Sequence, residues 1–234
     1  MNILAIECTH EALSAAVLRT GVVTEATCPE WKKAAESLVP LVEQVMSESR
    51  LKRQELECIA ISSGPGSFTA LRIGMSAAKG IAYGLGIPLI PVQTMPAMAS
   101  ALRAVGGMVM AVIPARKGEY YYASYCSEDL SSGGWHEEVQ RGSAAAVAAA
   151  AAVFARRGDS VVVGRRLIEV IPLLVGSSVA YREADFFSAR SLFSGAEKLF
   201  VGADAAGLSG VTPDYRQAFG SPSPTGRNDI TFPD

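Results

Sequence analysis

The sequence predicts a mixed α/β fold, and two patterns lead to this prediction. Residues 2–28 read as three short apolar strands separated by polar turns, which is typical of an antiparallel meander. Further along, strands and helices alternate, and this order is typical of a mixed sheet with right-handed crossover connections. A length of 234 residues with a hydrophobic share of 49% allows one large domain or two smaller ones, each with a real core.

The elements of the first part follow from hydrophobic period and turn signals. The meander strands are predicted at 2–6, 13–18 and 22–28. A helix is predicted over 34–50, because its apolar residues span an arc of roughly 160°, wider than the ~100° that seats a helix on one core. Pro40 should bend or loosen its first turns. A strand at 58–61 then leads through a glycine-rich turn into a second helix at 68–83.

The alternation continues through the second part. Strands are predicted at 87–92, 108–113, 119–126, 161–164 and 170–175. Helices are predicted at 94–105, 144–154 and 188–201. Ser143 can cap the alanine-rich helix, and the polar, glycine-rich residues 130–134 indicate a loop. The proline-rich stretch after Val211 indicates an extended tail with a mobile end.

The turn between the strand at 58–61 and the second helix is built for close approach. Pro65 fixes one φ angle, Gly64 and Gly66 allow angles that other residues resist, and Ser67 stands where a helix N-cap belongs. A strand, a glycine-rich turn and a helix N-terminus can bind an anion, but they also form an ordinary connection. The turn lacks the Lys of a P-loop and the third Gly of a dinucleotide fingerprint.

The second helix carries a stripe of small residues that includes Ala70, Gly74, Ala77 and Ala78. A glycine inside a helix costs about 1 kcal/mol relative to alanine, so close packing against a neighbour is the expected compensation. The neighbour is either the chain's own sheet or a helix of another chain, and the sequence leaves both interpretations open.

Composition excludes several classes of function. A net charge of −2, with scattered basic residues, argues against strong direct tRNA binding by this chain alone. The four cysteines form no C-x-x-C pair, and His10 and His136 are too far apart for the usual metal-ligand pairs, so no metal site is expected. Because neither a signal peptide nor a membrane-spanning apolar run is seen, we expect a cytoplasmic protein without membrane contact.

Four stretches of this sequence resemble the TsaB (YeaZ) family, the bacterial partner proteins of threonylcarbamoyladenosine (t6A) tRNA modification. They are N-I-L-A-I-E-C-T from Asn2, S-G-P-G-S-F-T-A-L-R-I-G from Ser63, I-P-A-R-K-G-E-Y-Y from Ile113 and P-D-Y-R from Pro213. The resemblance covers residues 1–125 in order. It implies an actin-like ATPase (ASKHA, ribonuclease H-like) fold of two mixed α/β lobes, with an N-terminal lobe at 1–105, a C-terminal lobe at 106–218 and a flexible tail at 219–234.

The resemblance also implies a role and partners. Such a chain is a non-catalytic scaffold or activator that binds TsaD, the catalytic relative that modifies adenosine 37 of tRNA, through its first two helices. The ATPase TsaE joins the complex, and the same helices can form a homodimer. The predicted interface residues are Leu38, Leu41, Val42, Val45, Phe68, Leu71, Arg72, Gly74, Met75, Ala78 and Tyr83.

The same resemblance predicts a vestigial phosphate or nucleotide site rather than a working one. Its residues are Glu7, Thr9, Gly64, Gly66 and Ser67. The sequence departs from the family pattern at Glu7, Ala70 and Pro114, where Asp, Gly and Asp are usual, and at Ala34 or Ala35, where His is common. We therefore expect no cofactor bound by this chain alone, which leaves open ATP or ADP with Mg at the boundary with the partner.

Two other functions remain to be weighed. The alternative is a small actin-fold ATPase or kinase with its own nucleotide site, which would need phosphate loops from both lobes. Val163-Gly164-Arg165-Arg166 is a poor candidate for the second loop. A peptidase has no Ser/His/Asp arrangement or metal cluster to support it.

Overall fold

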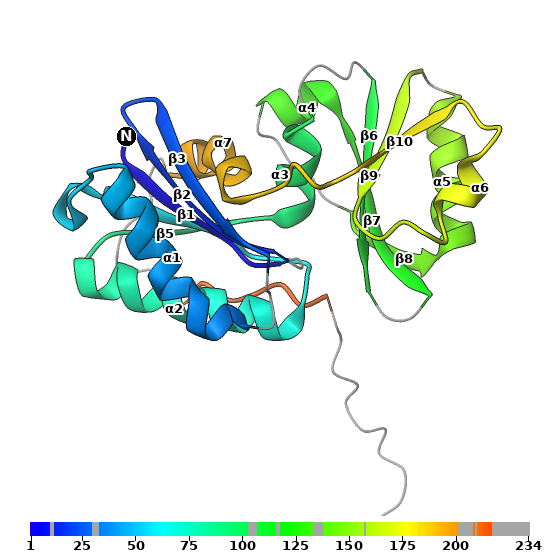
Figure 1. The fold of residues 1–234 in the computed structure, drawn as a ribbon. Coiled ribbons are helices and arrows are strands. Elements are labelled where there is room, and N and C mark those ends of the chain that lie inside the picture. Colours follow the sequence, from blue (N-terminus) through cyan, green and yellow to red (C-terminus); the bar gives the residue numbers. More distant parts are fainter. Residues whose placement is uncertain are drawn as a thin grey trace, which may run out of the picture.

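The computed structural model describes residues 1–9, 12–29, 33–102, 107–115, 118–132, 138–156, 158–200, 208 and 210–216. It contains two five-stranded mixed sheets that stand next to each other, with helices on their outer faces and between them (Figure 1). Histidines 10 and 136 lie outside the described residues. Within the described part of the chain, no helix is both long enough and apolar enough to span a membrane.

The first sheet has the order β3-β2-β1-β4-β5. Its strands are β1 (Ile3–Glu7), β2 (Leu13–Arg19), β3 (Val22–Cys28), β4 (Cys58–Ser62) and β5 (Leu89–Val92). β1, β2 and β3 pair antiparallel, which confirms the predicted meander, whereas β4 pairs parallel to both β1 and β5. β1 and β4 are buried along their whole length, as expected for central strands covered on both faces.

Two long helices cover one face of this sheet. They are α1 (Ala34–Glu48) and α2 (Phe68–Leu85), with a 3₁₀ turn, η2 (Arg53–Glu55), between α1 and β4. Both helices are confirmed near the predicted bounds, and α1 runs through Pro40. Their apolar faces pack with Leu4, Ile6 and Ile59 of the sheet into one core.

The opposite face of the first sheet packs toward the second sheet. Three short elements fill the space between the sheets: α3 (Thr94–Ser100), η3 (Ala189–Leu192) and α7 (Phe193–Leu199). η3 contacts β1 and β2, α7 contacts β5, and α3 contacts β6 of the second sheet. One core therefore joins the two lobes, with members such as Ile3, Met98, Ala111 and Leu192. The lobe bounds at 105 and 218 stay predictions, and residues 189–199 pack on the first sheet.

The second sheet has the order β10-β9-β6-β7-β8. Its strands are β6 (Met108–Pro114), β7 (Glu119–Cys126), β8 (Gln140–Ser143), β9 (Ser160–Gly164) and β10 (Val179–Glu183). The helices α5 (Ala144–Ala155) and α6 (Ile171–Leu174) pack on its outer face. The Ser143 hydroxyl accepts the Ala146 N–H at 3.3 Å, which confirms the predicted cap.

The structure corrects several local predictions in the second half. Residues 130–132, predicted as part of a loop, belong to helix α4 (Ser127–Ser132). The strand predicted at 170–175 is instead the helical turn α6, because Pro172 suits a first helical turn and the next strand, β10, takes the place beside β9. The helix predicted at 188–201 is divided into η3 and α7, and the one predicted at 94–105 ends at Ser100.

Candidate functional site

The glycine turn brings three distant parts of the chain into contact. Gly64 has a φ of +111°, and a Cβ there would lie 2.3 Å from the carbonyl oxygen of Asp214. A Cβ on Gly66 would lie 2.6 Å from the Cβ of Thr9. Glycine is therefore required at both positions because other segments occupy the space beside the backbone.

Hydrogen bonds within the chain hold this turn. The Gly64 N–H donates to the Thr94 hydroxyl at 3.1 Å, and the Ser67 N–H donates to the Thr9 carbonyl at 3.1 Å. The Asp214 N–H donates to the Ser63 carbonyl at 2.7 Å. The predicted N-cap role of Ser67 is wrong in one respect, since its side chain caps no N–H of α2.

The residues of the predicted phosphate site, Glu7, Thr9, Gly64, Gly66 and Ser67, do lie together, but the space around the two glycines is filled. A Cβ at either glycine would have to displace Thr9 or the backbone of Asp214. The phosphate or nucleotide site predicted at this turn stays a prediction, and we derive no nucleotide chemistry from it.

Glu7 is a fully buried carboxyl group at the end of β1. Its Oε1 accepts the N–H of Thr9 at 2.8 Å and also the Thr9 hydroxyl, whereas Oε2 has no hydrogen-bond partner in the described part of the chain. Burial raises the pKa of Glu7 above its ordinary value of 4.5. Burial thus makes ionisation of this carboxyl group more costly than it is in water.

The stripe of small residues on α2 faces the chain's own sheet. A Cβ on Gly74 would lie 2.1 Å from the Cys8 sulfur, and Ala78 is completely buried in the core beneath the helix. Of the two interpretations of this stripe, the structure supports close packing within the chain. An Ala78→Arg substitution would place a charged side chain in this core and detach the helix from its sheet. It would therefore not test a partner surface.

Most of the predicted interface residues also point inward. Those buried in the lone chain are Leu38, Leu41, Val42, Val45, Leu71, Gly74, Met75 and Ala78. Phe68 is half-buried, whereas Arg72 and Tyr83 are exposed, Tyr83 at 82%. Since most of these side chains are packed inside the chain, any surface that α1 and α2 offer must be made largely by their outer residues.

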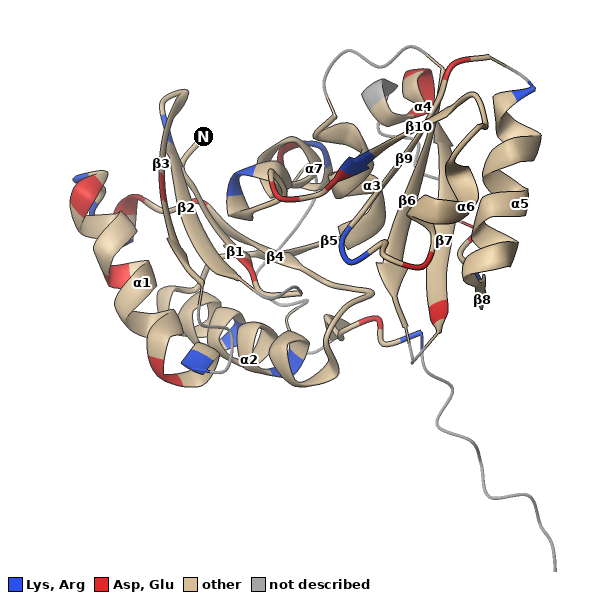
Figure 2. Ribbon diagram, turned by 45° about the vertical axis from the view of Figure 1, so that its right-hand side comes forward, with Lys and Arg blue, Asp and Glu red and all other residues tan. Residues whose placement is uncertain are grey.

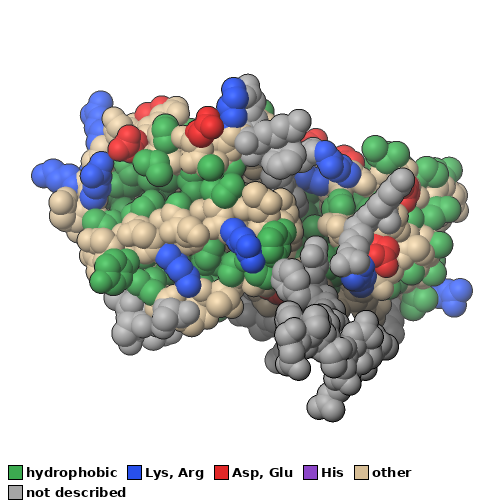
Figure 3. Space-filling model, turned by 90° about the horizontal axis from the view of Figure 1, so that it is seen from below, with side chains coloured by type: hydrophobic (Ala, Val, Ile, Leu, Met, Phe, Trp, Pro, Cys, Tyr) green, Lys and Arg blue, Asp and Glu red, His purple; other side chains and the backbone are tan. Residues whose placement is uncertain are grey.

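Such a surface exists as a groove between the two helices, which we call the α1/α2 groove. It has a volume of about 740 Å³. Its apolar residues are Leu4, Val39, Val42, Met46, Leu51, Leu56, Ile81 and Leu85, with Gly80 and Gly84 opening it on the α2 side. Val39 is 52% exposed, and Figure 3 shows apolar side chains gathered over these helices on the underside of the first lobe.

The rim of the α1/α2 groove is polar. Glu43 of α1 pairs with Arg53 of η2 at 3.6 Å, and Lys52 and Gln54 lie beside them. An apolar floor with a charged rim is the usual anatomy of a protein interface. Of the predicted interface residues, Val42 lines the groove, whereas Val39 and Ile81 were not among them. Helical period shows an apolar face but not how far the chain's own sheet covers it.

Phe68 and Arg72, two of the predicted interface residues, form a cluster with Tyr215 at the first turn of α2, and this contact was not predicted from the sequence. The Arg72 guanidinium lies 3.9 Å from the centre of the Phe68 ring, and its Nε donates to the Tyr215 hydroxyl at 3.1 Å. The rings of Phe68 and Tyr215 are 4.6 Å apart. The Tyr121 hydroxyl donates to the carbonyl of Arg216 at 3.0 Å, so residues 214–216 touch both lobes.

Comparisons with known proteins agree with this geometry. The family model of TsaD, tRNA N6-adenosine threonylcarbamoyltransferase, matches residues 20–135. The TsaB protein (tRNA threonylcarbamoyladenosine biosynthesis protein) of Escherichia coli is 36% identical over 142 residues, which cover 59% of this chain and 60% of that protein. The one from Bacillus subtilis is 32% identical over 126 residues, 53% of this chain and 55% of that protein. The chain thus spans less than two thirds of the length of these curated relatives.

Two solved structures extend the likeness to the whole fold. YeaZ from Pseudomonas aeruginosa superposes with a TM-score of 0.71 at 22% identity, over 92% of this chain and 99% of that one. A protein from the same organism, described as similar to peptidase YEAZ, gives 0.76 at 23% identity over the same shares. The two mixed sheets with this connectivity define a protein of the actin-like, ASKHA-type class. In sequence, the chain is similar to the TsaB (YeaZ) family over a little more than half of its length.

Proposed function

We propose that this chain acts in the synthesis of t6A in tRNA as a non-catalytic partner of TsaD, and that the α1/α2 groove is the surface that TsaD covers. The open apolar groove is the observation on which the proposal rests, because most of the other apolar side chains of the two helices pack against the first sheet. The names of the relatives and the TsaD family model support the pathway and the kind of partner.

The filled glycine turn supports a non-catalytic role. A kinase or ATPase needs loops that hold the phosphates, and at this turn the segments of Thr9 and Asp214 pack directly against the two glycines. The observation in favour of the alternative is Oε2 of Glu7, which has no hydrogen-bond partner among the described residues. The burial that raises the pKa of this carboxyl group also disfavours the ionised form that Mg²⁺ prefers. Calorimetry with Mg-ATP tests the alternative directly, and saturable binding that is lost in Glu7→Gln would favour the ATPase.

Charge supports a protein partner over direct tRNA binding. Figure 2 shows Lys and Arg interspersed with Asp and Glu on both lobes, without one broad basic face in the described residues. Nucleic-acid binders concentrate positive charge on one surface. TsaE as a further subunit, and a homodimer through the same groove, stay predictions.

The test is binding of purified TsaD from the same organism. Val39→Glu and Ile81→Glu place a carboxylate in the α1/α2 groove, and each is expected to weaken the complex at least tenfold by calorimetry or gel filtration. The matched control is Val153→Glu, because Val153 is an equally exposed valine, at 51%, on the outer helix α5 of the second lobe. Unchanged affinity in both groove variants, or an equal loss in the control, would contradict the assignment of the groove.

A further inference from the structure

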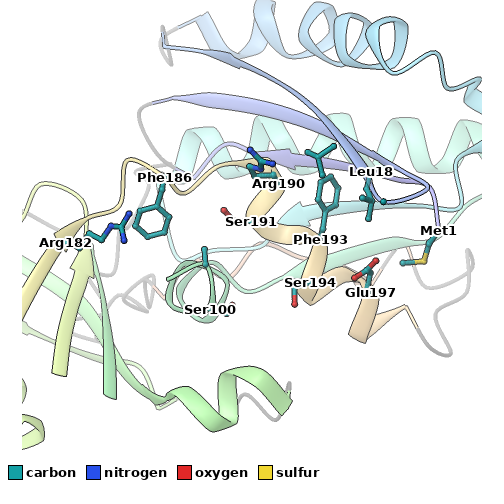
Figure 4. Close-up of a pocket in the computed structure, with 13 residues that line it drawn as sticks. Met1, Leu18, Ser100, Arg182, Phe186, Arg190, Ser191, Phe193, Ser194 and Glu197 are labelled. Carbon is teal, nitrogen blue, oxygen red and sulfur yellow. The ribbon is translucent and has the colours of Figure 1, made fainter. Parts of the chain in front are cut away.

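A second pocket, also of about 740 Å³, lies on the face of the first sheet that is turned away from α1 and α2. Leu18 and Val23 of the β2–β3 hairpin line it on one side, and Phe193 of α7 and Ser100 of α3 line it on another. Arg182 comes from β10 of the second sheet, so both lobes contribute to it (Figure 4). Its volume falls within the ~300–1,000 Å³ that is usual for small-molecule sites.

Two arginines line the pocket with unused hydrogen-bonding capacity. The Arg182 guanidinium lies over the Phe186 ring at 4.9 Å, and Nε of Arg190 lies 3.8 Å from a carboxylate oxygen of Glu25. Neither guanidinium donates a hydrogen bond within the described part of the chain, although each carries five N–H donors. The backbone N–H of Arg190 donates to Oε1 of Glu25 at 3.0 Å, which fixes the backbone position from which the Arg190 side chain extends.

Arg165, which follows β9, differs from these two arginines in its hydrogen bonds. Arg165 donates through Nε to the carbonyl of Ala184 at 3.0 Å and through Nη2 to that of Phe187 at 2.9 Å. The guanidinium of Arg165 thus holds the segment that connects β10 to η3. Arg182 stacks on Phe186 and Arg190 pairs with Glu25, but both guanidinium groups keep N–H donors that no described residue accepts. Both side chains are exposed and line the pocket.

The remainder of the lining is suited to a ring. Leu18, Val23 and Phe186 are half-buried and leave part of their apolar surface open to the pocket. Glu197 lies on the side away from Arg182, next to Met1 (Figure 4). The pocket therefore has Arg182 at one end, Arg190 farther in, apolar side chains that form an apolar middle, and at the far end the Glu197 carboxylate, which can accept an N–H (Figure 4).

We propose that this pocket binds a phosphate monoester attached to a planar ring, with the phosphate on Arg182 and Arg190 and the ring against the apolar middle. Guanidinium groups recognise phosphate oxygens through paired, charge-assisted hydrogen bonds. Two arginines with N–H donors still available therefore favour this anion. Nucleoside 5′-monophosphates and phenyl phosphate share the chemistry, and only the nucleotides offer ring N–H groups to Glu197. The pocket is separate from the α1/α2 groove, so the proposal does not depend on TsaD binding.

Calorimetry on the full chain tests the proposal with the four ribonucleoside 5′-monophosphates, phenyl phosphate, adenosine and inorganic phosphate. We expect at least one monophosphate to bind ten times more tightly than both adenosine and inorganic phosphate. Arg182→Gln and Arg190→Gln should each weaken it about tenfold, which corresponds to the loss of one charge-assisted contact. Arg156→Gln, an exposed arginine at the end of α5, is the matched control and should bind normally.

Ligand-induced NMR shifts at Ser100 and Ser191 locate the site independently, should one of the variants fail to fold. Glu197→Gln should weaken nucleotides but not phenyl phosphate. The proposal is overturned if no monophosphate binds saturably, if the two arginine variants bind like the wild type, or if adenosine or phosphate alone binds as tightly. Shifts confined to the glycine turn would also overturn it, because the ligand would then occupy a different site.

Discussion

The Cys8 sulfur lies directly against Gly74, at the place where any larger residue in α2 would carry its Cβ. This contact sets how closely α2 approaches the end of β1. Cys8 is buried, and burial raises the pKa of its thiol well above the ordinary value, so it behaves as a small apolar group.

Gly74→Ala should therefore destabilise the fold, although alanine is the better helix former. Overpacking of a tight core costs about 1–3 kcal/mol, which outweighs the gain of about 1 kcal/mol in helix propensity. Urea unfolding measures the change, and Cys8→Ala combined with Gly74→Ala should recover part of the loss. A stable single variant would show that α2 can move away from β1 at little cost. Gly80→Ala is the control, since a Cβ there meets no atom within 4 Å.

Tyr215→Ala should loosen residues 214–216 from α2. The substitution removes the ring contact with Phe68 and the hydrogen bond from Arg72, together worth about 1–2 kcal/mol. Hydrogen exchange at Asp214 should then accelerate, because its N–H is held by the Ser63 carbonyl only while the segment stays in place. Tyr215→Phe should show a smaller effect. Tyr181→Ala, at an exposed tyrosine of β10, should leave this amide unchanged; equal exchange in all three variants would contradict the prediction.

The buried carboxyl group of Glu7 should make the stability of the fold depend on pH. Its pKa is raised in the folded chain by burial, so between its unfolded and folded pKa values the folded state binds more protons than the unfolded state. The free energy of unfolding contributed by Glu7 therefore falls as pH rises above about 4.5. In urea unfolding at pH 4 to 8, the wild type should lose stability relative to Glu7→Gln. Glu43→Gln, at an exposed residue, is the control, and parallel profiles for Glu7→Gln and the wild type would refute the assignment.

Ser14 connects the first sheet to the returning chain. Its buried hydroxyl accepts the N–H of Ala189 at 2.9 Å, so Ser14→Ala leaves that donor unsatisfied. The expected loss is about 1–3 kcal/mol, measured by urea unfolding. Ser76→Ala, on the exposed side of α2, should change stability by less than about 0.5 kcal/mol. Equal values for the two variants would show that Ala189 finds another partner.

The sequence predicted the first lobe better than the second for a physical reason. The meander, α1, the glycine turn and α2 have strong local signals, and all are confirmed. β8 was missed because Gln140–Ser143 is a short polar edge strand with no hydrophobic alternation. The strand predicted at 170–175 was wrong, because a short apolar run is typical both of a buried strand and of a helical turn.

The candidate site was predicted only as far as its elements. Helical period located α1 and α2, but it could not show that Leu38 and Ala78 face the chain's own sheet while Val39 and Tyr83 face solvent. The glycines of the turn were correctly read as points of close approach. That Thr9 and Asp214 fill the space depends on contacts distant in sequence, which local patterns do not encode.

The return of η3 and α7 to the first sheet has a consequence for synthesis on the ribosome. β1 to β5 are complete once residue 92 has been made, yet the face that η3 contacts stays uncovered until residues 189–199 emerge. Nascent chains stalled before residue 189 should therefore expose an apolar sheet surface and bind chaperones. If released, they should not form a stable fragment.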